Sequence, residues 1–139
     1  MSRADYQTPT RNPDERYSDF LINFDKNPVT GNLAKFTNEE AVKQALKNLV
    51  LTNKGERFYN GQIGSNIKAS LFEPADAVVA DTIRTAIEQT IQYQEPRVNL
   101  LGIEIFDDFD NNAYRVNIVF NLINIPDVIS LDLLLKRAR

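Results

Sequence analysis

The stretch that decides the fold is residues 114–122, Tyr-Arg-Val-Asn-Ile-Val-Phe-Asn-Leu, in the last third of the chain. Apolar side chains occupy every second position of this stretch, which predicts a β-strand with one buried face. A similar alternation follows Pro126, and the extended run 98–106 precedes the stretch, with a slip at Leu101-Gly102 that predicts a bulge. Residues 107–112, Asp-Asp-Phe-Asp-Asn-Asn, have a composition typical of a turn. Together these segments predict three consecutive antiparallel strands.

Helical patterns lie upstream of these strands. Thr37 and Glu40 have the spacing of a capping box at the start of a helix. One apolar face of that helix is formed by Val42, Ala45, Leu46, Leu49 and Val50. A short helix is predicted over 67–72, with Asn66 as its N-cap. Pro74 suits the first turn of a longer helix, which is expected to end before Pro96. The longer helix has an apolar stripe at helical spacing, made of Val79, Ile83, Ala86, Ile87 and Ile91.

The N-terminal part of the chain predicts an arm followed by a hairpin. Residues 20–24 alternate, 25–31 are rich in turn formers, and 33–36 are extended again, as in a β-hairpin. Residues 1–16 are polar and predict a flexible or partner-ordered arm, whereas 17–139 predict a single domain. The predicted order is β-β-α-α-α-β-β-β, an α+β fold in which helices pack on one face of a small, mainly antiparallel sheet.

Composition narrows the chemistry that this chain can perform. The 139 residues include no histidine, no cysteine and no tryptophan. His- or Cys-based catalytic triads, zinc sites with their usual ligands and disulfides are therefore excluded, and we expect no cofactor and no metal. A net charge of −3 gives no basic footprint for nucleic acid. No apolar run predicts a membrane span or a signal peptide, so a cytoplasmic site of synthesis is expected.

The composition still allows catalysis by carboxylate side chains. A glycoside hydrolase needs two carboxylates in a cleft, roughly 5–9 Å apart. The glutamates that could supply them are Glu56, Glu73, Glu88 and Glu95, although their spacing does not indicate a pair. The acidic segment Asp107, Asp108 and Asp110 lacks the glycine and the glutamate of a calcium-binding EF-hand, so a hairpin turn is the preferred interpretation.

Two further segments could serve in binding. Glu95-Pro96-Arg97 stands where the long helix stops and a strand begins, and the helix dipole disfavours an anion there unless it is compensated. The segment is either a surface helix end or a docking site.

The final strand is either a charge-protected sheet edge or a template for another chain. Its outward positions are Val128, Ser130, Asp132, Leu134 and Lys136.

Four short motifs, which occur one after another along the chain, resemble those of a known protein family. Residues 48–57 match the pattern N-L-x-x-T-x-x-G-E-R, and Ile63-Gly64-Ser65, 71–74 (Leu-Phe-Glu-Pro) and 95–97 (Glu-Pro-Arg) follow. Over roughly residues 19–135 the chain resembles the small baseplate wedge proteins of contractile phage tails. That family is often labelled lysozyme-like and has a counterpart in type VI secretion. The chain departs from the pattern at Ile63, where phenylalanine is common, and at Asn60-Gly61, where prolines are frequent.

The resemblance implies a structural, non-enzymatic virion protein of the tail baseplate, assembled in the host cytoplasm. It implies that Glu95, Pro96 and Arg97 dock on the core bundle of the larger wedge proteins. The C-terminal strand, 128–136, would template the first ring of the tail sheath protein. Gly55, Glu56, Arg57 and Gly64 would form a structural loop that caps the first helix and braces the core. Tail tube or hub proteins are further candidate partners, and a lysozyme-like hydrolase is the alternative function.

Overall fold

The computed structural model describes residues 18–20, 26, 28–32, 35–123 and 125–137. Contacts divide the chain into two compact units, residues 1–42 and 43–139, and each is described by itself. The predicted arm, 1–16, lies outside the described residues, and the single-domain prediction for 17–139 stays a prediction.

The first unit contains a short antiparallel pair, β1 (Ser18–Phe20) and β2 (Lys35–Thr37), in which Ser18 pairs with Thr37. Residues 28–30, within the predicted turn segment, form a turn, whereas 21–25, 27, 33 and 34 lie outside the described residues. Helix α1 (Glu39–Leu51) then begins one residue later than the capping-box pattern predicts. Asn38, with a φ of 51°, precedes the helix, and its carbonyl accepts a hydrogen bond from the Val42 N–H at 3.1 Å. Asparagine tolerates this left-handed conformation better than most residues. The predicted Thr37 cap depends on a side chain outside the described part of the chain and stays a prediction.

The second unit is built on a three-stranded antiparallel sheet in the order β3-β4-β5. β3 (Val98–Asp108) pairs with β4 (Ala113–Leu122), which pairs with β5 (Val128–Lys136). The register shifts between Leu100 and Gly102, which confirms the predicted bulge. The buried side chains of the central strand include every second residue from Tyr114 to Leu122, so one face of the sheet is the core face.

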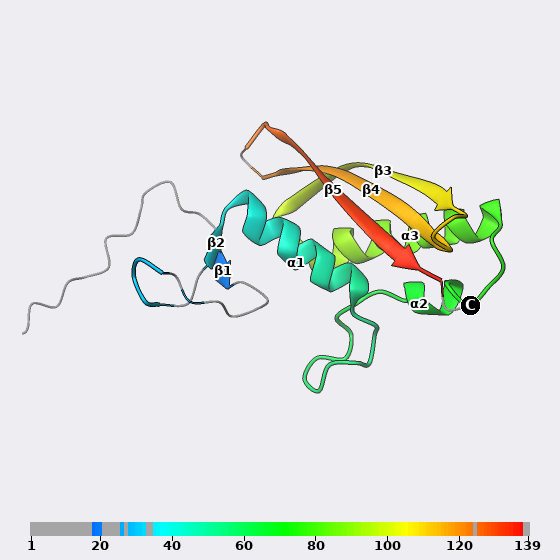
Figure 1. Cartoon of the computed structure of the whole chain (residues 1–139), viewed down its shortest axis with the longest axis horizontal. Coiled ribbons are helices and arrows are strands. Elements are labelled where there is room, and N and C mark those ends of the chain that lie inside the picture. The colour runs from blue at the N-terminus through cyan, green and yellow to red at the C-terminus, as the bar shows by residue number, and fades with distance from the viewer. Residues whose placement is uncertain (1–17, 21–25, 27, 33–34, 124, 138–139) are drawn as a thin grey trace, which may run out of the picture. The chain divides into compact units, whose positions relative to one another are not determined.

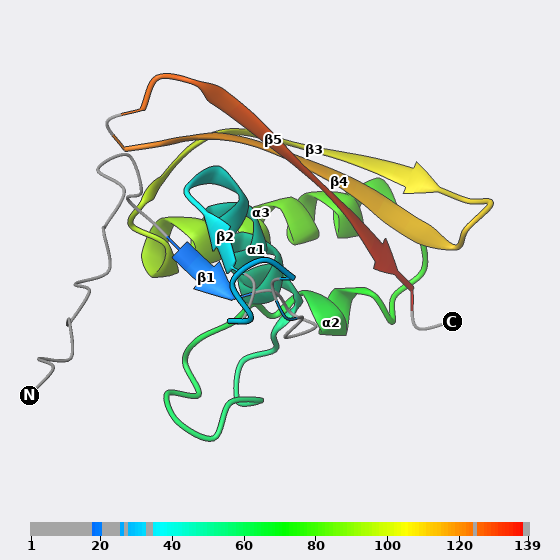
Figure 2. The ribbon, with the colours of Figure 1, turned by 60° about the vertical axis from the view of Figure 1, so that its left-hand side comes forward.

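Helices cover that core face. Figures 1 and 2 show α3 (Ala77–Gln94) running beneath the sheet, with α2 (Ile67–Ser70) near the C-terminal end of β5. The fully buried side chains of this unit include Leu46, Ile83, Ile87, Ile91, Val116, Ile118 and Phe120. The observed element order, two strands, three helices and three strands, gives the predicted α+β fold. None of the described helices has both the length and the apolar character needed to cross a membrane.

Two helix ends differ from the predictions. α3 begins at Ala77 after Asp76, whose φ of −144° and ψ of 153° are extended, so Pro74 lies outside the helix. α2 ends at Ser70, although the Phe72 N–H still donates to the Ala69 carbonyl at 3.3 Å. Asn66 precedes α2 without making a side-chain capping bond. Periodicity located the helices correctly, whereas their ends depend on backbone turns that have no apolar pattern.

Candidate functional site

The segment after α1 is a loop closed by its own hydrogen bonds. The Asn53 N–H donates to the Glu56 Oε2 at 2.9 Å, and the Glu56 N–H donates to the Asn53 carbonyl at 3.1 Å. The Gly55 N–H reaches the Gly61 carbonyl at 2.7 Å and closes the neck of the loop. Gly55 has a φ of 84°, a conformation that glycine adopts without a steric cost. Glu56 therefore stabilises the turn that follows α1.

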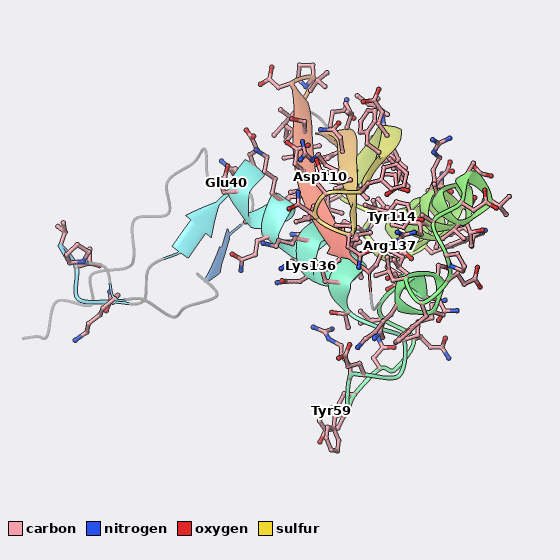
Figure 3. All side chains as sticks on the ribbon, turned by 45° about the vertical axis from the view of Figure 1, so that its right-hand side comes forward. Glu40, Tyr59, Asp110, Tyr114, Lys136 and Arg137 are labelled. Atoms are coloured by element: carbon pink, nitrogen blue, oxygen red, sulfur yellow. The ribbon has the colours of Figure 1, made fainter. Side chains whose placement is uncertain are left out.

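Beyond this neck the loop leaves the body of the second unit. Arg57, which was predicted to brace the core, is exposed instead, because the chain turns outward after Glu56. Phe58 and Tyr59 are 104% and 90% exposed, and Figure 3 shows Tyr59 at the loop tip. Neither aromatic residue was among the predicted site residues.

The loop returns to the body at Gly64, in close contact with the end of α1. Gly64 is buried with a φ of 123°, and a Cβ atom there would lie 2.5 Å from the Thr52 carbonyl oxygen. The Ser65 N–H donates to that same oxygen at 2.8 Å, and the Ser65 Oγ donates to the Val50 carbonyl at 2.6 Å. Carbonyls at the C-terminus of α1 thus find their partners in the returning loop.

Gln94, at the last position of α3, holds the loop from the other side. The Gly64 N–H donates to the Gln94 Oε1 at 2.8 Å, and the Gln94 Nε2 donates to the Gly64 carbonyl at 3.0 Å. Both backbone groups of a buried residue are thereby satisfied by one side chain. Gln94 was not among the predicted site residues, because a side chain that binds backbone 30 residues away leaves no local pattern.

The next three residues, 95–97, connect α3 to the sheet. The Glu95 N–H donates to the Ile91 carbonyl at 3.0 Å and completes the last turn of α3. The Val98 N–H donates to the Glu95 carbonyl at 3.3 Å, and the Ile123 N–H donates to the Arg97 carbonyl at 3.0 Å. The segment therefore joins the end of α3, the start of β3 and the end of β4.

Glu95 and Arg97 form a bidentate ion pair with each other. The Arg97 Nε donates to the Glu95 Oε1 at 2.6 Å, and a terminal guanidinium nitrogen donates to the Oε2 at 2.8 Å. Glu95 is only 7% exposed, so its carboxylate is compensated at the negative end of the helix by Arg97. The two side chains meet beside the exposed Pro96. Pro96 is exposed and Arg97 is half-buried, whereas Glu95 is buried and accepts bonds from Arg97 at both of its carboxylate oxygens.

A broad groove of about 600 Å³ lies next to this pair. It is mostly apolar and is lined by Val98, Asn99, Asn121, Leu122, Ile123, Ile125 and Pro126. The bond from Ile123 to the Arg97 carbonyl connects the groove directly to the ion pair.

β5 lies at an edge of the sheet, as the sequence analysis proposed. Its five outward residues are exposed, with Val128 at 66% and Leu134 at 47%, and the Asn117 amide donates to Asp132 at 2.6 Å on the same face. The Arg137 N–H donates to the Asn112 carbonyl at 3.0 Å, in register with the β4–β5 ladder. In an antiparallel pair every second residue bonds to the neighbouring strand. The odd-numbered residues of β5 therefore bond to β4, and the even-numbered residues direct their N–H and C=O groups to the open edge.

The four candidate glutamates differ in their surroundings. Glu56, Glu73 and Glu88 are exposed, whereas Glu95 is buried and both of its oxygens accept bonds from Arg97. Among the described residues, no three acidic side chains gather as a metal site would require.

The acidic segment between β3 and β4 is a hairpin turn, and Asp108 organises it. Its Oδ2 accepts a bond from the Asn111 amide at 2.9 Å and one from Arg115 at 3.0 Å. Hydrogen bonding from Asn111, with a smaller contribution from Arg115, holds the pKa of the Asp108 carboxyl below its usual value.

A family model described as baseplate wedge protein gp25 matches residues 37–127, which is more than half of this chain. The matched span includes the loop after α1, the ion pair and the first two strands of the three-stranded sheet. The chain belongs to the gp25 family of baseplate wedge proteins. The resemblance carried by four short motifs is thereby confirmed.

Individual relatives agree with this assignment. The baseplate wedge protein gp25 of Enterobacteria phage T4 is 30% identical over 87 residues, which cover 63% of this chain and 66% of that protein, just under two thirds of its length. A chain in the cryo-EM structure of the anti-feeding prophage baseplate has a TM-score of 0.68 and 28% identity, and the match covers 80% of this chain and 89% of that one. This member of the gp25 family is thus a baseplate component of a phage tail or tail-like particle.

A third relative shares the fold alone. A crystal structure from Geobacter sulfurreducens, provisionally described as a tail lysozyme, has a TM-score of 0.62 and 18% identity, covering 73% of this chain and 94% of that one. Identity at this level does not carry an activity from one protein to another. The relatives of higher identity are named for the baseplate, which suggests a structural role.

Proposed function

We propose that this chain is a non-enzymatic wedge component that docks on the core bundle of larger wedge proteins and templates the first sheath ring. The observation that carries the proposal is the open edge of β5. Its even-numbered residues, from Val128 to Lys136, combine exposed side chains with outward backbone groups. An extended segment of the tail sheath protein would bond to these groups as a further strand. Assembly in the host cytoplasm and contacts with tail tube or hub proteins belong to the same proposal.

Docking on the larger wedge proteins is supported by the rigidity of the Glu95–Arg97 segment. Pro96 fixes the backbone, and Arg97 is held by two bonds to a buried carboxylate. A partner therefore meets a preorganised surface and loses little conformational entropy when it binds. The adjoining apolar groove, with Ile123 48% exposed at its wall, would receive an apolar helix face of the bundle.

The docking surface can be tested with Ile123→Asp, which places a charge in the groove from an exposed position. We expect this variant to remain folded and to lose co-purification with the larger wedge proteins of the same tail. Val78→Asp is the matched control, because Val78 is 69% exposed on α3 and lies outside the groove. Equal recovery of the wedge proteins by Ile123→Asp and Val78→Asp would show that the groove is not the docking surface.

The sheath-templating edge can be tested with Leu134→Pro. The Leu134 N–H points to the open edge, so proline removes a donor for an added strand without removing a bond to β4. Leu134→Ala is the control, since it retains that N–H. We expect baseplates that contain Leu134→Pro to assemble but to nucleate no sheath in electron micrographs. Normal sheath growth on Leu134→Pro baseplates would exclude β5 as the template.

A further inference from the structure

A cleft of about 220 Å³ lies along the open edge of β5, towards its C-terminal end. Consecutive residues of β5 line one side of the cleft, and no residue of β4 does. The opposite side is formed by the end of α1 and by α2, which Figures 1 and 2 show near the end of β5. Its lining is largely apolar and includes Leu51, Ile67, Leu71 and Leu135.

The position of the cleft determines which residue of a strand added to β5 would project into it. Residues directly opposite each other on neighbouring strands point to the same face of the sheet. Leu135 points to the helix-covered face and is 3% exposed. The residue that an added strand sets opposite Leu135 would therefore project towards the helices, into the space bounded by Leu51 and Leu71. The volume of the cleft suits one large aliphatic or aromatic side chain.

The rim of the cleft is basic. Lys68 on α2 and Lys136 on β5 both line it and are both exposed, and no acidic side chain is part of its lining. Lys136 lies on the outer face of the sheet, as would the residues that flank the inserted one on the added strand. An acidic residue at such a flanking position would meet Lys136 as an opposite-charge cross-strand pair.

We propose that this cleft is a specificity pocket for the strand that β5 captures. The inference rests on the proposed sheath-templating function and specifies its ligand. The ligand is an extended segment of the tail sheath subunit that carries one large apolar residue facing the helices and an acidic residue next to it. Backbone bonds along the open edge of β5 hold the strand, and the cleft sets its register, because a shift of one residue would turn the apolar side chain to the outer face.

The probes for this proposal are overlapping fifteen-residue peptides that span the sheath subunit of the same tail. Their binding to the full chain is measured by fluorescence anisotropy. We expect the tightest binder to contain the apolar and acidic pair. Replacing its apolar residue by alanine should weaken binding by about 10- to 100-fold, which corresponds to burial of one large apolar side chain. This peptide variant tests the pocket without any change to the folded chain.

A variant of the chain tests the same contact from the other side. Leu51 is 49% exposed and lines the cleft, so Leu51→Trp fills the cleft while the edge of β5 stays open. We expect it to weaken binding as much as the alanine peptide does. Leu101→Trp is the matched control, because Leu101 is 51% exposed and lies on β3, at the opposite edge of the sheet. Its affinity should equal that of the unmodified chain.

The outcomes separate the pocket from the edge. If Leu134→Pro abolishes binding but the alanine peptide and Leu51→Trp do not weaken it, the pocket proposal is overturned and the templating function stands. If no sheath peptide binds, or if Leu134→Pro binds them all normally, the templating function is overturned and the pocket proposal with it. A chain that dimerises through β5 and is thereby closed to every peptide would identify a second copy as the occupant, which also overturns the proposal.

Discussion

Gly64→Ala is the substitution that most directly tests how the loop is attached to the body. The new Cβ would lie 2.5 Å from the Thr52 carbonyl oxygen and 2.9 Å from the Asn53 carbonyl carbon. Both atoms are backbone, so neither can rotate away. The φ of 123° is also unfavourable for alanine. To accept the methyl group, the loop must move away from the end of α1 and lengthen the bond from the Ser65 N–H to the Thr52 carbonyl, now 2.8 Å.

The expected destabilisation follows from these two effects. A residue held in an unfavourable region of backbone space costs about 1–3 kcal/mol. Overpacking by one methyl group in a site that cannot relax costs about 1–3 kcal/mol as well. Because partial movement of the loop relieves both effects together, we expect a loss of about 3 kcal/mol in the free energy of unfolding. For a chain of this length that corresponds to a fall in Tm of roughly 9–15 °C.

Thermal unfolding followed by circular dichroism measures this effect, with Gly61→Ala as the matched control. Gly61 lies in the same loop, but a Cβ there would be 3.6 Å from the nearest atom, the Gly55 Cα, at an ordinary contact distance. We expect Gly61→Ala to melt within about 2 °C of the unmodified chain, as substitutions without a specific cost do. A Gly64→Ala variant that melts together with Gly61→Ala would refute the close approach of the loop to α1.

Three further predictions concern the polar contacts. Arg97→Lys keeps the charge but cannot form both bonds to Glu95, so we expect the free energy of unfolding, measured in urea, to fall by about 1–2 kcal/mol. Arg97→Ala should cost more, because it leaves a buried carboxylate unpaired. Gln94→Leu leaves two buried backbone groups of the loop unsatisfied and should cost about 2–4 kcal/mol by the same measurement. Asn111→Ala should raise the pKa of Asp108 towards its ordinary value, as NMR titration of the carboxyl carbon would report.

The lowered pKa of Asp108 determines how stability changes with pH. The pKa of Asp108 is lower in the folded chain than in the unfolded one. Its contribution to stability is therefore present above the ordinary pKa of an unfolded aspartate and is lost as the pH falls through the lower folded pKa. In Asn111→Ala that loss should begin at a higher pH. An unchanged Asp108 titration would show that the Asn111 bond does not stabilise the carboxylate.

Local patterns determined the elements of this fold because each depends on a short repeat. Alternation in residues 114–122 is sufficient for a strand with one buried face, and a slip of one residue at Leu101-Gly102 is sufficient for a bulge. Glu95-Pro96-Arg97 also marked the junction between helix and strand, since a proline disfavours the helical conformation at the residue that precedes it. The helix starts at Glu39 and Ala77 escaped prediction, because turn geometry decides them and apolar spacing does not.

The sequence alone thus determined the class of fold, the absence of histidine and cysteine chemistry, the motifs of the wedge family and the terminal strand. Only the tertiary structure decided how these parts act together. It joined Arg97 to Glu95 in an ion pair, joined Gln94 to Gly64 across 30 residues, and set a cleft beside the open edge of β5. The physical reason is that periodicity records which face of an element is buried, whereas a side chain's partner depends on which elements the fold brings within about 3 Å of it.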